Sequence, residues 1–372
     1  IRERRGSVSY VKWPELRLGK HSPRYPLIQG GMGVLISGPR LAAAVAREGG
    51  VGTIASVGVA CRSSSYLQGK NYFQANKIAL GDAIREARAN APQGVLAVNA
   101  MVALTDYDLH ITTACESGID VLITGAGLPL KLPELTKDFP DVALVPIVSS
   151  VRAAQLIVRK WEKSYGRLPD AFVVETPLYA GGHLGATKME HVTDQTFSLE
   201  AVIPELVTVV EKEFRADIPI IAAGGIWSAE DMEAAFNLGA RGIQVGTRFA
   251  CTQEGDASDR FKQAYIDAKE EDVVVIMSPV GIPGRALRNP FVERYLAGNV
   301  ESKPCIANCL TFCSYKKERK AFCIAQALID AYEGRWEEGL FFCGSNVTRC
   351  HRMETVPEVF DAFFGADRAP SR

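Results

Sequence analysis

The chain has 372 residues, with 42 Lys and Arg against 43 Asp and Glu and a net charge of −1. At 47% hydrophobic and 23% charged residues it can bury a sizeable core, so we expect a folded protein rather than a disordered chain. The basic residues are scattered, which argues against nucleic acid or an anionic membrane as the main partner. No apolar run approaches the ~20 residues that span a bilayer, and the first residues lack the apolar segment of a secretory signal.

From about residue 26 onward, short apolar runs alternate with amphipathic stretches. The apolar runs lack strict alternation, as expected of strands buried on both faces of a parallel sheet. We predict strands at Tyr25–Gln29, Gly52–Ser56, Val95–Asn99, Asp120–Thr124, Ala143–Val148, Ala171–Glu175, Pro219–Ala223 and Gly242–Gly246. Predicted helices between them include Pro39–Glu48, Asn76–Asn90, Val151–Tyr165, Leu199–Phe214 and Ala229–Leu238.

Eight strand–helix units predict a TIM (β/α)8 barrel over residues 1–290, with an open doubly wound sheet as the alternative. Ser228 before Glu230 and Asp231 predicts a helix start, and Gly239 a helix end. Residues 291–372 lose the alternating rhythm. We expect them to form a mostly helical C-terminal extension packed on the barrel, with helices at Phe322–Tyr332 and Val356–Phe364.

Glycines follow the last two predicted strands. Gly224 and Gly225 come after the seventh, and Gly246 and Thr247 after the eighth. Phosphate sites in barrels commonly use these two loops, because glycine lets backbone N–H groups approach phosphate oxygens. Either pair alone is typical of a tight turn, but both together favour a phosphate site.

Further candidates follow the first and third strands. Gly30, Gly31 and Gly33 suggest a flat ring lying against the backbone, and Met32 suits packing beside an isoalloxazine. Ordinary core packing is the alternative for Met32. Asn99 offers a donor and an acceptor to a ring or a phosphate, with bracing of a loop as the alternative.

His183 is the strongest catalytic candidate. It follows Gly181 and Gly182 in the loop after the sixth strand, and imidazole exchanges protons near neutral pH. A structural histidine is the alternative. Glu175 ends the sixth strand, where it could act as a base, accept hydrogen bonds from a ribityl chain or brace a loop. We favour the last two roles. The remaining histidines are expected at the surface: His21, His110, His191 and His351.

Nine cysteines without an export signal indicate a reducing cytoplasm. Four of them are close in sequence: Cys305, Cys309, Cys313 and Cys323. On a continuous helix the first three would share one face, and four thiolates can hold zinc or an iron–sulfur cluster. Buried free thiols are the alternative. Cys343 and Cys350 are expected to be auxiliary ligands or packing residues.

Four segments together resemble nitronate monooxygenases, formerly called 2-nitropropane dioxygenases. They are Pro26–Gly33, Ala180–His183, Ile221–Ile226 and Gln244–Phe249, and the resemblance runs from about residue 14 to 290. Flavin-dependent enoyl-acyl-carrier-protein reductase II and NAD(P)H:quinone reductases belong to the same superfamily. The resemblance implies a TIM barrel that binds FMN non-covalently.

The resemblance also assigns roles. His183 would be the catalytic base or proton donor. Residues expected to bind the cofactor are Gly31, Met32, Gly33, Asn99, Glu175, Gly181, Gly182, Gly224, Gly225, Gln244, Gly246 and Thr247. The chain departs from some relatives at Thr176–Tyr179, where a carboxylate is replaced and Tyr179 would reshape the pocket. Arg285 and Arg288 would meet a nucleotide or phosphopantetheine phosphate, or form salt bridges.

We therefore expect an FMN-dependent oxidoreductase acting on nitronates or another small activated molecule. A second hypothesis is an NAD(P)H-dependent enoyl-thioester or quinone reductase. A third is a barrel that only binds a phosphorylated ligand. The sequence leaves the oligomeric state open between a monomer and a homodimer.

Overall fold

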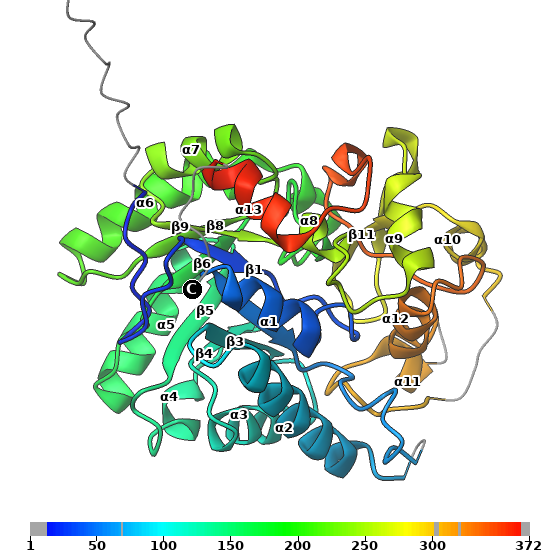
Figure 1. The fold of residues 1–372 in the computed structure, drawn as a ribbon, viewed down its shortest axis with the longest axis horizontal. Coiled ribbons are helices and arrows are strands. Elements are labelled where there is room, and N and C mark those ends of the chain that lie inside the picture. The colour runs from blue at the N-terminus through cyan, green and yellow to red at the C-terminus, as the bar shows by residue number, and fades with distance from the viewer. Residues whose placement is uncertain (1–12, 68–69, 301–304, 319–320, 366–372) are drawn as a thin grey trace, which may run out of the picture.

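The structure is a computed structural model that describes residues 13–67, 70–300, 305–318 and 321–365 (Figure 1). Eight parallel strands close into a barrel, since β1 pairs with both β2 and β9. The strands are β1 (Leu27–Gln29), β2 (Val51–Ala55), β3 (Val95–Met101), β4 (Val121–Gly125), β5 (Ala143–Val148), β6 (Phe172–Glu175), β8 (Ile220–Ala223) and β9 (Gly242–Val245). The predicted TIM barrel is confirmed, and the open sheet is excluded.

Helices surround the barrel strands. They are α1 (Pro39–Arg47), α2 (Tyr72–Asn90), α3 (Tyr107–Glu116), α4 (Leu132–Leu135), α5 (Val151–Tyr165), α6 (Leu199–Lys212), α7 (Ala229–Asn237) and α8 (Thr247–Ala250). Ser228 caps α7 through a reciprocal capping box with Asp231, as predicted. Gly239 follows α7 with a φ of +106°, where a side chain would be strained. Within the described ranges, every helix is too short or too polar to cross a bilayer.

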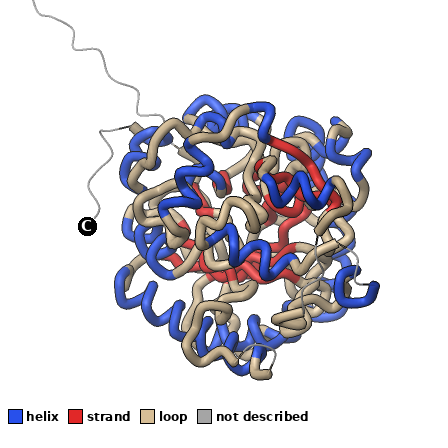
Figure 2. The backbone as a smooth tube through the Cα atoms, turned by 90° about the vertical axis from the view of Figure 1, so that its right-hand side faces the viewer, coloured by secondary structure: helices blue, strands red, loops and turns tan. Residues whose placement is uncertain are grey.

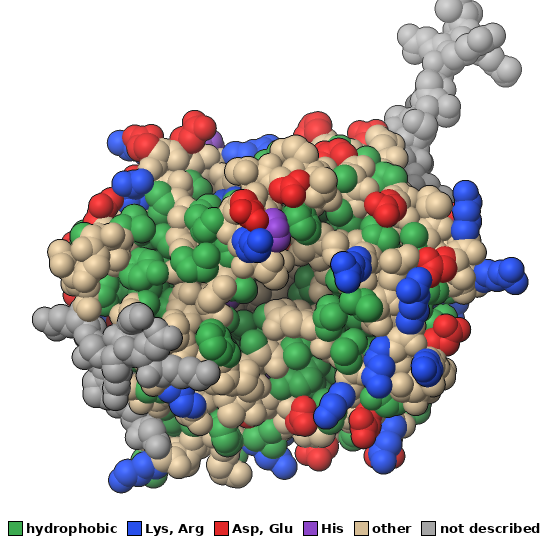
Figure 3. Space-filling view, turned by 180° about the vertical axis from the view of Figure 1, so that it is seen from behind, with side chains coloured by type: hydrophobic (Ala, Val, Ile, Leu, Met, Phe, Trp, Pro, Cys, Tyr) green, Lys and Arg blue, Asp and Glu red, His purple; other side chains and the backbone are tan. Residues whose placement is uncertain are grey.

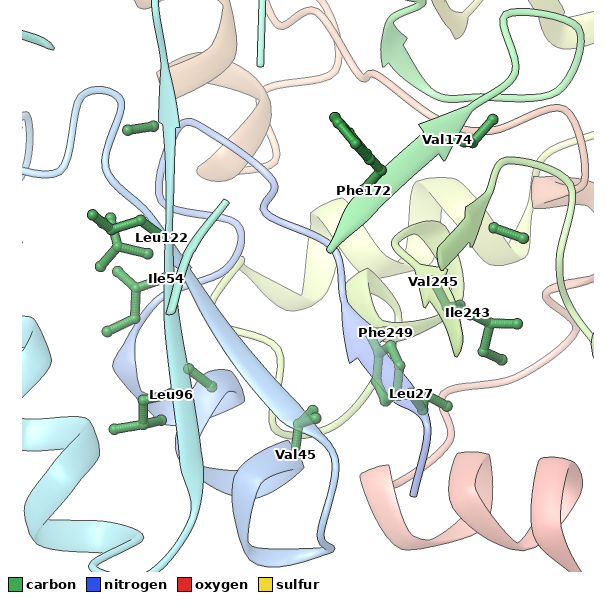
Figure 4. Close-up of a cluster of buried hydrophobic side chains, with 14 of the residues drawn as sticks. Leu27, Val45, Ile54, Leu96, Leu122, Phe172, Val174, Ile243, Val245 and Phe249 are labelled. Carbon is green, nitrogen blue, oxygen red and sulfur yellow. The ribbon is translucent and has the colours of Figure 1, made fainter. Parts of the chain in front are cut away.

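The side chains of the barrel strands pack in two cores. One set of side chains faces the helices, including Leu27, Leu96, Phe172 and Val245 (Figure 4). The alternate set forms the barrel interior, where Leu16 and Leu18 of the N-terminal segment join Ile28, Ala97 and Ile221. Both leucines are almost fully buried, so this segment closes the N-terminal end of the barrel.

A small antiparallel sheet lies outside the barrel. It consists of β10 (Val273–Met277), β11 (Pro283–Leu287) and β7 (Gly182–His183), with β11 in the middle. Ser278–Arg285 covers the turn of this hairpin and the beginning of its second strand. The β-branched run of β10 explains why the segment is extended.

The helices that follow α8 along the chain are α9 (Asp259–Ile266), α10 (Pro290–Leu296), α11 (Ser314–Glu318), α12 (Ile324–Tyr332) and α13 (Val356–Phe364). Short 3-10 helices lie at Met189–Val192, Gln195–Phe197, Glu270–Asp272 and Val347–Arg349. In the view turned by 90°, helices lie around the outside of the central strands (Figure 2). Helix α13 packs against α7 and α8 (Figure 1). Its Phe360 and Phe364 rings lie 5.7 and 4.5 Å from the Tyr25 ring at the start of the barrel. The extension therefore shares a core with the barrel.

Replacing Phe360 by alanine tests this shared core. Phe360 is fully buried, so Phe360→Ala should lower the free energy of unfolding by ~3–5 kcal/mol. Urea denaturation followed by circular dichroism measures the loss. Leu156→Ala, at a half-exposed position on α5, is the control and should change the free energy by less than ~1 kcal/mol. Equal midpoints for the Phe360 variant and the parent would show that α13 does not stabilise the barrel.

Candidate active site

A cavity of about 260 Å³ opens at the carboxyl ends of the barrel strands. All thirteen predicted site residues line it: Gly31, Met32, Gly33, Asn99, Glu175, Gly181, Gly182, His183, Gly224, Gly225, Gln244, Gly246 and Thr247. They converge because parallel strands present their carboxyl ends at one rim of a barrel. On the face of the molecule shown in Figure 3, acidic and basic side chains are interspersed.

The glycines after β1 are required by close packing within the protein. A Cβ on Gly31 would lie 2.3 Å from the Cβ of Asn99, and one on Gly33 would lie 2.0 Å from Val57 Cγ1. The sequence interpretation gave these glycines to a ligand ring. The structure shows that contact with Asn99 of β3 and with Val57 in the loop after β2 already excludes side chains there.

The loops after β8 and β9 form a second group of glycines. Gly224 and Gly225 have φ values of +94° and +81°, which favour glycine. A Cβ on Gly225 would also lie 3.0 Å from the Tyr179 side chain. Gly246 differs, because its φ is −106° and a Cβ there would meet only Met32, 3.6 Å away. The space in front of Gly246 is therefore open for a ligand.

Residues from the C-terminal extension complete this side of the cavity. The Gly344 backbone N–H donates to Thr247 Oγ1 over 2.8 Å, and Phe342 and Asn346 also line the cavity. Sequence reasoning missed all three, because they lie far from the barrel strands along the chain. The turn-forming triplet 344–346 after an apolar run was the available signal.

Gln244 carries an unsatisfied acceptor in the cavity wall. Gln244 lies in β9 and lines the cavity. Its Oε1 atom is buried and has no hydrogen-bond partner among the described residues. Buried acceptors are rarely left unpaired, so this oxygen fits a ligand that brings an N–H or O–H donor.

His183 is fixed on β7. Backbone pairing places it opposite Gly284, its Nε2 lies 2.9 Å from Ser278 Oγ in the hairpin turn, and its ring packs edge-on against Phe342 at 5.2 Å. Burial lowers the pKa of the imidazole from 6.5 to about 4. His183 is therefore neutral at pH 7 and can accept a proton.

Glu175 lies at the end of β6 in the same cavity wall. Burial raises the pKa of its carboxyl from 4.5 to about 7, so near neutral pH a large fraction is protonated. A protonated carboxyl donates a hydrogen bond as well as accepting one. Glu175 and His183 thus give the cavity two proton-exchanging groups whose charged forms are disfavoured by burial.

The arginines have structural roles. Arg285 is buried and donates to the backbone carbonyls of Pro177 at 3.2 Å, Leu178 at 3.0 Å and Ala180. It holds the segment after β6, so the phosphate-binding alternative is wrong for Arg285. Arg288 forms the expected type of salt bridge, 3.0 Å from Glu293.

The surface assignment of His110 is wrong. This residue is fully buried, with Nδ1 2.8 Å from Ser56 Oγ and Nε2 3.0 Å from Asp106 Oδ2. Asp106 also accepts from Asn76 over 2.8 Å, so the imidazole joins α2, α3 and the end of β2. Its helical position in the sequence did not distinguish an inward face from an outward one.

The predicted cysteine segment is not helical. Residues 305–313 form an irregular segment before α11, so the i, i+4, i+8 arrangement does not apply. All nine cysteines are free thiols, and among the described residues no three Cys, His, Asp or Glu side chains are placed to hold a single metal ion. Cys343 and Cys350 pack in a different core from Cys323, which makes them packing residues.

The fold and the cavity define a TIM-barrel protein with a ligand site at the carboxyl ends of its strands. The sequence profile of the nitronate monooxygenase family matches residues 15–364. The chain belongs to this family and is an enzyme of the oxidoreductase class.

Individual relatives agree. A probable nitronate monooxygenase of Staphylococcus aureus (strain Newman) is 27% identical over 303 residues, which are 76% of this chain and 80% of that protein. The structure of FabK from Thermotoga maritima is 25% identical with a TM-score of 0.69 and covers 92% of both chains. A nitroalkane oxidase from Streptomyces ansochromogenes is 17% identical with a TM-score of 0.67, covers 92% of this chain and 95% of that one, and shares the fold.

Glu175→Gln tests the protonation of the cavity wall. The unfolded parent ionises Glu175 near 4.5 and the folded parent near 7, so the parent loses stability as pH rises through this window. Glutamine cannot ionise. The stability of the variant relative to the parent should therefore grow from pH 4.5 to 7, measured by urea denaturation at several pH values. Glu205→Gln, on the exposed side of α6, is the control. A pH-independent difference would contradict the raised pKa.

Proposed function

We propose that this protein is an FMN-dependent oxidoreductase that oxidises nitronates or a similar small activated molecule. The observation that carries this proposal is the position of His183 in the same cavity as the glycine loops after β8 and β9. One wall offers a neutral proton acceptor, and the other offers backbone and hydroxyl groups for a phosphorylated cofactor.

The cavity suits FMN in three respects. Gly246 leaves open space for a phosphate, and Gly224, Gly225 and Thr247 line the same cavity in loops where phosphate sites of barrels commonly lie. Because Gly344 donates to Thr247 Oγ1, the hydroxyl hydrogen is free to point to a phosphate oxygen. The unpaired Gln244 Oε1 would accept from an N–H of the ring or an O–H of the ribityl chain.

When bound, FMN supplies reversible uptake and release of electrons. The protein residues handle protons and position the substrate. Neutral His183, held by Ser278, can accept the acidic proton of a nitroalkane or donate a hydrogen bond to the oxygen of a nitronate. Protonated Glu175 adds a second donor without placing negative charge beside an anionic substrate.

The second candidate is an enoyl-thioester or quinone reductase that uses NAD(P)H. The likeness to FabK over 92% of the chain favours it. Two assays of the flavin-loaded protein separate the candidates: oxygen uptake with propyl nitronate, and NAD(P)H oxidation with a crotonyl thioester or a quinone. Turnover in the first assay alone supports the proposal. Turnover confined to the second would replace nitronate oxidation by reduction.

Two further proposals concern the protein in the cell. Nine free thiols suit a reducing compartment, so we place the protein in the cytoplasm. The size of the cavity suits a small-molecule substrate. For the assembly state we expect a monomer or a homodimer.

A larger side chain at position 246 should weaken binding of the cofactor. Gly246→Val is compatible with the backbone φ of −106° and adds methyl groups to the open space in front of Gly246. We expect the Kd for FMN to rise at least ~10-fold, a loss of about 1.4 kcal/mol. Quenching of flavin fluorescence measures Kd, and Gly81→Ala in α2, outside the cavity, is the matched control. Unchanged affinity in a folded Gly246 variant would remove this loop from the cofactor site.

His183→Gln should reduce turnover with the active substrate by ~10²–10⁴-fold, because it removes a general base. The content of bound flavin should stay the same, since the glycine loops are intact. His191→Gln, on the part-exposed 3-10 helix Met189–Val192, is the control. Full turnover of the His183 variant with every substrate tested would remove this residue from the mechanism.

A further inference from the structure

The cavity has an apolar arm on the side opposite the proposed phosphate site. Around the closed barrel, β3 and β4 lie across from β8 and β9. Met101, the last residue of β3, lines the cavity on that side. Further apolar residues line it from outside the barrel strands, and with Met101 they define the arm: Val34, Tyr72, Leu310, Ile324 and Leu328.

The C-terminal extension covers this arm at the end of β3. Leu310 forms an isolated backbone bridge with Leu104, three residues after β3 ends. The Thr105 N–H donates to the Cys309 carbonyl over 3.0 Å, next to the same bridge. These backbone contacts hold Leu310 at the rim, where its buried side chain contributes to the cavity wall.

Helix α12 supplies a second part of the arm. Ile324 and Leu328 are four positions apart, so they lie on one face of this helix. Leu328 packs in the same cluster as Val34 and Tyr72, which are both buried. The arm is therefore a packed apolar surface in the protein alone, and a hydrocarbon group could bind there without rearrangement of charged side chains.

The cavity offers no cation to an anionic group. None of the described residues that line it is Lys or Arg. Burial raises the pKa of the Cys309 thiol at the edge of the arm, so this sulfur is a neutral group at pH 7. A carboxylate moved from water to such a surface loses its hydration without gaining a charged partner. A methylene group moved there gains free energy, since apolar area leaves water.

We propose that the apolar arm binds the hydrocarbon chain of the substrate, so that the enzyme selects nitronates with an uncharged chain of several carbons over nitronates that carry a carboxylate. This proposal rests on the proposed function. With the nitro group beside His183, the chain extends to the arm on the β3 side of the cavity. Leu310, Ile324 and Leu328 are then specificity-determining residues that the barrel itself does not supply.

The test compares two compounds of nearly the same shape with opposite ends. The compound 4-methyl-1-nitropentane ends in an isopropyl group, and 4-nitrobutanoate ends in a carboxylate. With the flavin-loaded protein at neutral pH, kcat/KM for the first nitronate should exceed that for the second by at least ~100-fold. It should also exceed kcat/KM for the nitronate of nitroethane by at least ~10-fold, because each buried methylene adds a factor of about three to four.

Binding separates failure of this proposal from failure of the proposed function. Isothermal titration calorimetry gives the Kd of both nitro compounds for the flavin-loaded protein without any turnover. If no nitronate is oxidised, the proposed function fails, and tighter binding of 4-methyl-1-nitropentane still supports the apolar arm. Equal binding, tighter binding of 4-nitrobutanoate or binding of neither compound overturns it. Where nitronates are oxidised, equal kcat/KM for the matched pair overturns it as well.

A charge placed in the arm should change the selectivity. Leu328→Lys brings an ammonium group to the surface that the chain would contact, so the preference for the isopropyl compound should fall at least ~10-fold. Leu156→Lys, at a half-exposed position on α5 outside the cavity, is the matched control and should keep the preference of the parent. An unchanged preference in a folded Leu328 variant would contradict the position of the arm. Circular dichroism checks folding, and the parent comparison decides where the variant does not fold.

Discussion

The antiparallel pairing of β7 with β11 is the constraint on which the candidate site depends. Only two residues of β7 take part: Gly182 lies opposite Arg285, and His183 lies opposite Gly284. This pairing fixes the direction of the imidazole, and Ser278 at the turn of the same hairpin bonds to its Nε2. The Arg285 guanidinium holds the chain just before β7 through three backbone carbonyls. One hairpin thus fixes both the backbone and the side chain of the central residue.

The same hairpin links the barrel to the C-terminal extension. Ala286 of β11 forms a bridge to Phe342, whose ring packs on His183, and Gly344 two residues later bonds to Thr247 after β9. The cavity is therefore built by both parts of the chain. The extension supplies Gly344 beside the proposed phosphate site, and it supplies the Phe342 ring that packs against His183.

The sequence predicts the barrel and the rim residues well because both depend on local patterns. Each barrel strand is a compact apolar run, and residues at its carboxyl end must reach the common rim. Features set by distant contacts were missed. Strand β7 is two residues long and exists only through β11, while Phe342 and Gly344 reach the cavity from nearly one hundred positions after Thr247.

Local pattern also fails where one residue type suits two settings. His110 sits in an amphipathic helix, and only the packing of α3 on α2 decides that it faces inward to Ser56 and Asp106. Gly31 and Gly33 were assigned correctly to the cavity, but the reason for glycine lies in their contacts with Asn99 and Val57. A small residue beside a ligand site does not by itself show what requires it to be small.

The N-terminal segment has a kinetic consequence. Leu16 and Leu18 fill the barrel end opposite the cavity, so molecules reach the reactive groups through the rim formed by the strand ends. An electron donor and an electron acceptor that share this entrance would come and go in turn. We therefore expect the two reactants to bind one after the other, with release of one product before the next reactant binds.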